Sequence, residues 1–179
     1  MNRFCAKFLI PFVVLLFFAG CDYHPVSVLP DHVKTVAIET FSNKTAYYGI
    51  EEKLTQEIVE EFLREGRLGV AKKEEADSLL SGKIVRYTLE PLSYDENDIV
   101  EEYRLWIVVD ITFKDLKMDQ ILWEQGGIGP RGEEQGVKRY VRYYVTPKAG
   151  QMVETEEDAL DRLIDKLAND VVHLILRWQ

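Results

Sequence analysis

The chain has 179 residues, a formal net charge of −9, 46% hydrophobic residues and only two cysteines. This length suits a single domain, and the composition is that of a folded globular chain rather than of a disordered or collagen-like one. The acidic balance argues against a nucleic-acid binder, which would usually carry a basic face, and two cysteines exclude a scaffold held by many disulfides.

The first twenty residues have the features of an export signal. Arg3 and Lys7 give a basic start, and residues 8–18 form an unbroken apolar run of 11 residues. A membrane-spanning helix needs about 20 apolar residues, so this run is too short and instead fits the apolar region of a secretory signal peptide. We therefore predict that residues 1–20 are a signal peptide outside the fold.

The sequence that follows the apolar run, Phe18-Ala19-Gly20-Cys21, resembles a bacterial lipobox, in which the cysteine thiol accepts a diacylglyceryl group. Phe18 departs from the aliphatic residue that this pattern prefers, and an ordinary signal peptide with a cysteine near the cut is the alternative. We predict that Cys21 is the lipidation site. Each buried methylene contributes ~0.8 kcal/mol, so two or three acyl chains would anchor the mature chain to a membrane.

Residues 21–32 contain two prolines and little periodicity, which predicts a lipid-anchored tether. Residues 33–179 are then expected to form one domain. Its first strand is predicted over residues 33–41, which are rich in β-branched side chains. A helix is predicted over residues 47–65, because apolar residues recur there every four positions.

Alternating apolar and polar residues predict the strands that follow. Residues 79–89 form one of them, and residues 101–113 are the clearest, with one fully apolar face and one partly polar face. Such alternation is typical of a half-buried antiparallel strand. Residues 121–123 begin another strand. After the glycine-containing connection 125–136, residues 137–146 form a further strand or continue the same one.

The last predicted element is an amphipathic helix that begins after Thr155. The segment Thr155-Glu156-Glu157-Asp158 resembles a capping box with Asp in place of the usual Glu, and its acids suit the positive end of the helix dipole. The order strand, helix, strands, helix predicts an α+β fold. Its simplest packing places two helices on one face of a mostly antiparallel four-stranded sheet.

Few residues have the pattern of a catalytic or metal site. His24 and His32 lie in the predicted tether and His173 in the last helix, neither close together nor paired with carboxylates at metal-ligand spacing. The chain has no nucleophile elbow and no phosphate-binding glycine loop. We predict no metal, no cofactor and no enzymatic activity; an unrecognised enzyme is the remotest alternative.

One segment interrupts the acidic background. Residues 135–153 contain no acid, and cations alternate there with tyrosines. This mixture suits an anionic, sugar-bearing ligand, because cations hold phosphates and ring faces pack on sugars. The simpler alternative is an edge strand protected by basic side chains over half-buried tyrosines. The candidate ligand-binding residues are Lys138, Arg139, Tyr140, Arg142 and Tyr144.

Several short segments in a fixed order resemble a known family. They are Cys21-Asp22-Tyr23-His24, residues 36–45 (VAIETFSNKT), Gly49-Ile50-Glu51 with Leu54-Thr55, residues 76–84 (ADSLLSGKI) and residues 102–105 (EYRL). Together with the closing amphipathic helix, they resemble the LptE family of lipopolysaccharide-assembly lipoproteins. The resemblance spans nearly the whole mature chain.

The resemblance implies a small two-helix, four-stranded domain that sits as a plug inside the LptD outer-membrane barrel. Such a protein would help to assemble that β-barrel and contact lipopolysaccharide on its way to the surface, without catalysis and without nucleic acid. It would be held at the periplasmic face of the outer membrane through Cys21. Asp22, where the family more often has Gly, resembles an inner-membrane retention signal of enteric bacteria, so the inner membrane is the alternative location.

Two non-catalytic alternatives remain open from the sequence. A lipoprotein that activates a peptidoglycan synthase has domains that resemble this one through the pattern of residues 36–45, but a long disordered linker is expected after its cysteine. Here the tether after Cys21 has only 11 residues, which favours a site at the membrane. The other alternative is an envelope adaptor with a different periplasmic partner.

Overall fold

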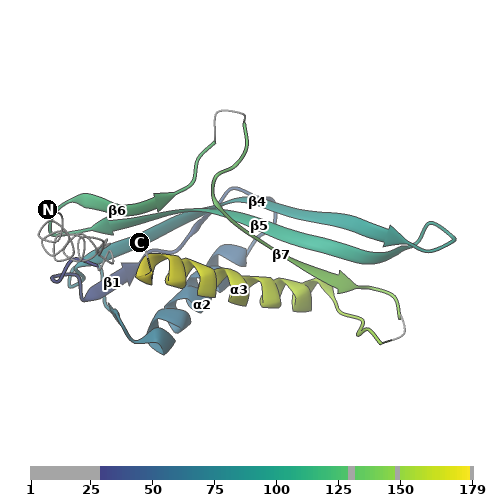
Figure 1. The fold of residues 1–179 in the computed structure, drawn as a ribbon, viewed down its shortest axis with the longest axis horizontal. Helices are drawn as coiled ribbons and strands as arrows, with labels where there is room; N and C mark the ends of the chain where they lie inside the picture. Colours follow the sequence, from purple (N-terminus) through teal and green to yellow (C-terminus); the bar gives the residue numbers. More distant parts are fainter. Residues whose placement is uncertain (1–28, 129–131, 148–149, 178–179) are drawn as a thin grey trace, which may run out of the picture.

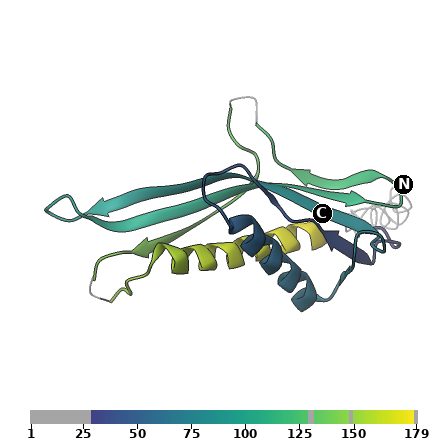
Figure 2. The same cartoon turned by 180° about the vertical axis from the view of Figure 1, so that it is seen from behind.

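Two helices cover one face of a long, seven-stranded mixed sheet (Figures 1 and 2). The computed structural model describes residues 29–128, 132–147 and 150–177. The predicted signal peptide, Cys21 and most of the predicted tether lie outside these ranges, so their assignment stays a prediction.

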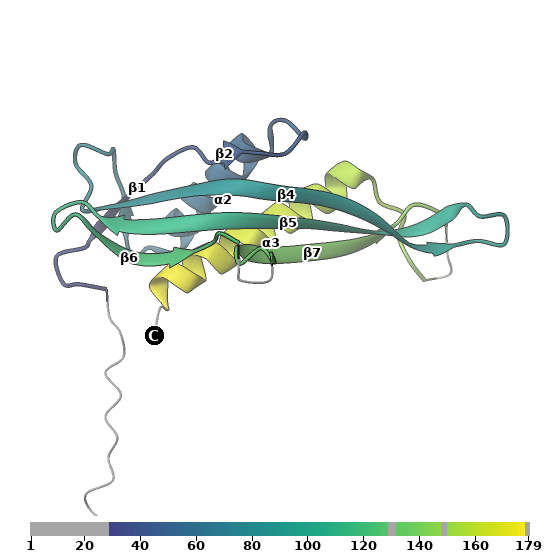
Figure 3. The same ribbon diagram turned by 90° about the horizontal axis from the view of Figure 1, so that it is seen from above.

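The sheet is built around one long hairpin. Its strands are, in chain order, β1 (Thr35–Ile38), β2 (Ser42–Asn43), β3 (Gly69–Val70), β4 (Ser78–Tyr94), β5 (Val100–Asp115), β6 (Gln120–Gln125) and β7 (Val137–Tyr144). β4 and β5 pair antiparallel along almost their whole length. β6 and β7 both pair with the other edge of β5, one after the other, as Figure 3 shows. The two late strands therefore act as one interrupted strand, with residues 126–136 between them.

The prediction of an α+β fold with two helices is confirmed, but the predicted four-stranded, mostly antiparallel sheet is wrong in detail. β1 pairs in parallel with both β3 and β4, and β2 pairs in parallel with β4. A parallel partner needs a crossover connection, and here the first helix supplies it between β1 and β4. β2 and β3 have two residues each. Segments that short carry no periodicity, so the sequence did not indicate them.

Both helices form where the apolar periodicity predicted them. α2 (Ile50–Glu65) ends at Gly66, whose φ of 67° is a left-handed conformation that glycine adopts without strain. α3 (Glu156–Leu176) begins with the predicted capping box: the Thr155 hydroxyl accepts the Asp158 N–H, and the Asp158 carboxylate accepts the Thr155 N–H. Within the described ranges, no helix is both long and apolar enough to cross a membrane.

The hydrophobic core lies between the helices and one face of the sheet. The apolar face of β5 supplies its centre, and the residues that the sequence placed there are buried from Leu105 to Phe113. The stripes of α2 and α3 close over them, with Ile58 and Leu163 fully buried. The opposite face of the sheet is not covered by either helix (Figure 1).

Asp77 joins the start of β4 to the start of β1. Its Oδ2 accepts hydrogen bonds from the backbone N–H groups of Lys34 and Thr35 at 2.9 and 3.0 Å, and from the Thr35 hydroxyl at 3.0 Å. The Nζ of Lys117 lies 2.6 Å from Oδ1. The Lys117 ammonium and these donors hold the pKa of the Asp77 carboxyl well below its usual range, against the opposing effect of burial.

We expect Asp77→Ala to lower the free energy of unfolding by about 1–3 kcal/mol, because two backbone donors lose their acceptor. The lowered pKa gives the effect a pH dependence: the stabilisation is present above the unfolded-state pKa of about 4 and is lost as the pH falls towards the lower folded-state value. Urea unfolding of the wild type and the variant at pH 7 and below pH 4 measures the loss of stability and its pH dependence. Glu74→Ala, at an exposed site, is the control; an equal loss in both variants at pH 7 would refute the assignment.

Candidate ligand-binding surface

Strand β7 presents its side chains alternately to the two faces of the sheet. Tyr143 is buried in the core beneath the helices, and Arg139 on the same face forms an ion pair with Asp170 of α3. The opposite face carries the other four predicted residues, Lys138, Tyr140, Arg142 and Tyr144. The structure therefore brings four of the five candidates to one face and separates Arg139 from them.

Neighbouring strands add an indole and further cations to this face. Tyr140 lies directly opposite Trp106 of β5, and Arg142 lies opposite Arg104. Arg86 of β4 approaches Trp106 from the other side, with its Cζ 5.8 Å from the ring centroid. Directly opposite residues on antiparallel strands share a face. We name the resulting set the cationic-aromatic face: Arg86, Arg104, Trp106, Lys138, Tyr140 and Arg142.

Cations and rings alternate across the three strands of this face. The Nζ of Lys138 lies 3.7 Å from the centroid of the Trp106 ring, and the Cζ of Arg104 lies 5.5 Å from that of Tyr140. Cation–π contacts at exposed sites contribute about 0.5–1 kcal/mol each, so they hold the cations in place without burying them. Between these side chains is an open groove of about 320 Å³. Its lining residues are Glu90, Arg104, Trp106, Lys138 and Tyr140.

Each arginine of the face also has a carboxylate nearby. The shortest ion-pair distances are 2.6 Å for Arg86–Glu134, 3.6 Å for Arg104–Glu90 and 3.5 Å for Arg142–Glu102. Hydrogen bonds from Arg86 lower the pKa of the Glu134 carboxyl, and so keep that carboxylate ionised. The other two distances exceed that of a normal charge-assisted hydrogen bond. These two guanidinium groups can therefore turn toward a phosphate without giving up a short contact.

The connection between β6 and β7 needs glycine at both of its ends. A Cβ at Gly126 would lie 2.6 Å from the Asp110 Cγ, and one at Gly136 would lie 2.6 Å from the carbonyl oxygen of Val109. Any other residue would clash where the chain leaves and re-enters the sheet beside β5. The connection departs on the side away from the helices (Figure 2), and Glu134 at its end reaches Arg86. The connection therefore borders the cationic-aromatic face.

Sequence reasoning missed part of this face. Arg104 and Trp106 are on the partly polar face of the strand predicted over residues 101–113, but nothing linked that face to β7. Arg86 comes from a third strand. The alternation of apolar and polar residues in each strand was the signal that could have assigned these side chains to one of two faces. The register that aligns Trp106 with Tyr140 is a property of the fold.

Two histidines lie beside carboxylates that the sequence pattern did not indicate. His32, placed in the tether, has its Nε2 2.5 Å from the Oδ2 of Asp115 at the end of β5. Burial works against ionisation of Asp115, but hydrogen bonds from Met118, His32 and Lys117 outweigh it and lower the pKa of this carboxyl. His173 lies 3.7 Å from a carboxylate oxygen of Glu65.

The fold and this surface define a class of protein: a small α+β domain with one sheet face closed by helices and one open face lined with cations and aromatic rings. The sequence pattern of one family, described as "LptE: Lipopolysaccharide-assembly", matches residues 33–175. Because the match covers most of the chain, the protein belongs to the LptE family. The resemblance found in the sequence is thus confirmed.

Several solved structures are similar to this chain at low sequence identity. Protein CT253 from Chlamydia trachomatis is 9% identical with a TM-score of 0.51, covering 79% of this chain and 94% of that one. A minor lipoprotein from Acinetobacter baumannii is 16% identical with a TM-score of 0.46, covering 80% and 92%. Lipoprotein B from Nitrosomonas europaea is 21% identical with a TM-score of 0.40, covering 85% and 84%. No curated protein sequence matches the chain.

Proposed function

We propose that the chain is a non-catalytic lipoprotein of the lipopolysaccharide-assembly machinery. In this function it plugs the LptD outer-membrane barrel, helps that barrel to assemble and contacts lipopolysaccharide in transit. Membership of the LptE family supports the assembly role. The lipid on Cys21 would hold the domain at the periplasmic face of the outer membrane.

The observation that supports ligand contact most directly is the cationic-aromatic face. Lipopolysaccharide presents phosphates and sugars, and guanidinium groups form charge-assisted hydrogen bonds with phosphate while ring faces pack on sugars. The net charge of −9 repels an anion from the molecule as a whole. A local concentration of cations such as Arg104, Lys138 and Arg142 overcomes this repulsion where the ligand binds.

The contact with the barrel wall is proposed for the connection between β6 and β7 and for the adjoining edge of β7. The described ends of this connection leave the sheet on the side away from the helices (Figure 2), and β7 lies beside it, paired with β5. Crosslinkers placed at Gly132 and at Arg142 test this assignment. We expect capture of the barrel from Gly132 and of the glycolipid from Arg142, and capture of neither would refute both contacts.

The whole proposal is tested by purifying the tagged full-length chain from detergent-solubilised envelopes. A large β-barrel protein and lipopolysaccharide are expected to co-elute with it. Elution without any barrel protein, from cells in which the chain is produced at its natural level, would contradict the proposed function.

Cys21→Ala tests the anchor. Without the thiol the chain has no site for the diacylglyceryl group, so metabolic labelling with an acyl probe should fall to background. Cys5→Ala, within the signal peptide, is the matched control and should leave labelling and fractionation unchanged. Persistent labelling of the Cys21 variant would exclude the lipoprotein assignment. Density fractionation of the wild-type envelopes distinguishes the outer from the inner membrane.

A further inference from the structure

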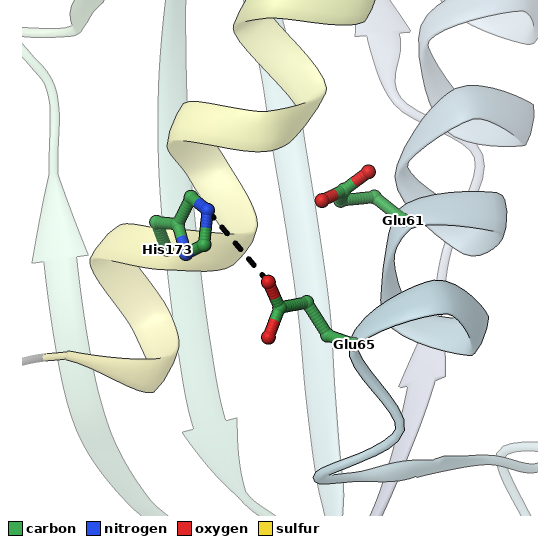
Figure 4. Close-up of side chains that lie close together, drawn as sticks. All are labelled: Glu61, Glu65 and His173. Atoms are coloured by element: carbon green, nitrogen blue, oxygen red, sulfur yellow. Dashed lines mark ion pairs between the residues drawn. The ribbon is translucent and has the colours of Figure 1, made fainter.

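Three possible metal ligands meet between the ends of the two helices, which cover the sheet face opposite the cationic-aromatic face. Glu61 and Glu65 lie one turn apart on α2, and His173 lies on α3. One ligand atom from each residue lies within 4.8 Å of the other two, and the His173 Nε2 is 3.7 Å from the Glu65 Oε1. Figure 4 shows the three side chains directed into the space between the helices.

Contacts around Glu61 fix the orientation of its carboxylate. Glu61 is only 3% exposed, and its Oε1 accepts a hydrogen bond of 3.0 Å from the Asn169 side chain while its Oε2 pairs with Arg64. A carboxylate oxygen has two lone pairs, so each oxygen retains capacity for a further ligand bond. Carboxylates that bind metals are commonly held by such second partners, which orient them toward the ion.

The electrostatic setting favours a cation at this point. Glu65 is the last residue of α2, and His173 lies in the last turn of α3. Helix C-termini carry partial negative charge, which disfavours the two carboxylates there unless a cation accompanies them. Arg64 supplies one positive charge on the Glu61 side, and Arg67 hydrogen-bonds to the Leu176 carbonyl at the end of α3. Glu61, Glu65 and Arg64 together carry a formal charge of −1, and the Arg67 guanidinium is directed to the Leu176 carbonyl rather than to these carboxylates.

We propose that Glu61, Glu65 and His173 bind a divalent transition-metal ion of the Zn²⁺ class. One imidazole nitrogen and two carboxylate oxygens form a donor set that Zn²⁺ accepts, and a hard cation such as Mg²⁺ would prefer oxygens alone. The Glu65 and His173 side chains are 30% and 29% exposed, so solvent reaches the fourth position. The ion would tie the ends of α2 and α3 together. This site is independent of the proposed function.

The experiment is a calorimetric titration of Zn²⁺ into the detergent-solubilised full-length chain after treatment with a chelator. We expect one saturable site per chain. His173→Gln and Glu65→Gln should each weaken binding at least tenfold, because each removes a direct ligand. Two controls should keep the wild-type affinity: His32→Gln, which changes the other described histidine, and Glu52→Gln, which changes an exposed glutamate on the same helix.

Thermal unfolding supplies a second measurement. Excess Zn²⁺ should raise the melting temperature of the wild type and of both controls, but not that of His173→Gln or Glu65→Gln, since a ligand stabilises only the folded state that binds it. Glu61→Gln is a weaker test because its side chain is buried and its loss can destabilise the fold. Absence of saturable Zn²⁺ binding by the wild type would overturn the proposal, as would equal binding by the two ligand variants.

Discussion

Gly82→Ala is expected to be among the most destabilising single substitutions in this protein. A Cβ at position 82 would lie 2.1 Å from the Cε1 of Phe41 and within 2.6 Å of two further atoms of that ring. Phe41 is 2% exposed and packed in the core, so its ring cannot move aside without displacing its neighbours. Overpacking of this kind costs about 1–3 kcal/mol and can cost more.

Urea unfolding of three variants measures the effect. Phe41→Ala alone should cost about 3–5 kcal/mol through loss of the buried ring. The double variant Gly82→Ala with Phe41→Ala should cost less than the sum of the single changes, because the added methyl then points into space that the ring has left. Gly69→Ala is the matched control, since the nearest atom to its Cβ is 3.6 Å away. Additive costs in the double variant would contradict the proposed clash.

The second large effect is expected at the cationic-aromatic face. The double variant Lys138→Gln with Arg142→Gln removes two cations of the cationic-aromatic face. We expect its affinity for purified lipopolysaccharide to fall at least tenfold. Hydrogen bonds to a charged group contribute about 1.5–3 kcal/mol each, so two of them account for a loss of this size. The wild-type affinity should also weaken as salt is raised, because salt screens exposed charges.

Arg139→Gln is the matched control for this titration. It removes the same charge from the same strand, but Arg139 is on the helix side and pairs with Asp170. A general attraction between an anionic ligand and a basic segment would make all three positions equivalent. Equal losses of affinity in the Arg139 variant and in the double variant would therefore contradict a binding site on this face. Undiminished binding by the double variant would contradict it as well.

The elements with strong local signals were predictable from the sequence. Alternation identified the buried face of β5, and the Thr155 capping box located the start of α3. The parallel pairing of β1 with β4 was not predictable, because β1 alone does not specify its partner and residues 39–77 separate the two strands. The two-residue strands β2 and β3 exist only through their pairing with longer neighbours.

The candidate surface was likewise predictable only in part. The sequence predicted the cations and tyrosines of β7 as a candidate site. It also predicted a strand there, but not which side chains face the helices. Because neighbouring side chains of a strand point to opposite faces, Arg139 lies on the helix side and Lys138 on the other. Trp106 and Arg86 lie on this surface because of the register in which β4, β5 and β7 pair. Likewise, His173 and Glu65 come together only through the packing of α3 on α2, more than a hundred residues apart in the chain.

A photo-activated crosslinker in place of Tyr140 tests the central claim most directly, because this side chain is 56% exposed at the middle of the cationic-aromatic face and its replacement should not disturb the core. In intact cells, irradiation should join the chain to lipopolysaccharide. The same crosslinker at Leu63, which is 64% exposed on α2, should capture far less of it. Absence of lipopolysaccharide from the Tyr140 product, or equal capture from both positions, would contradict the account.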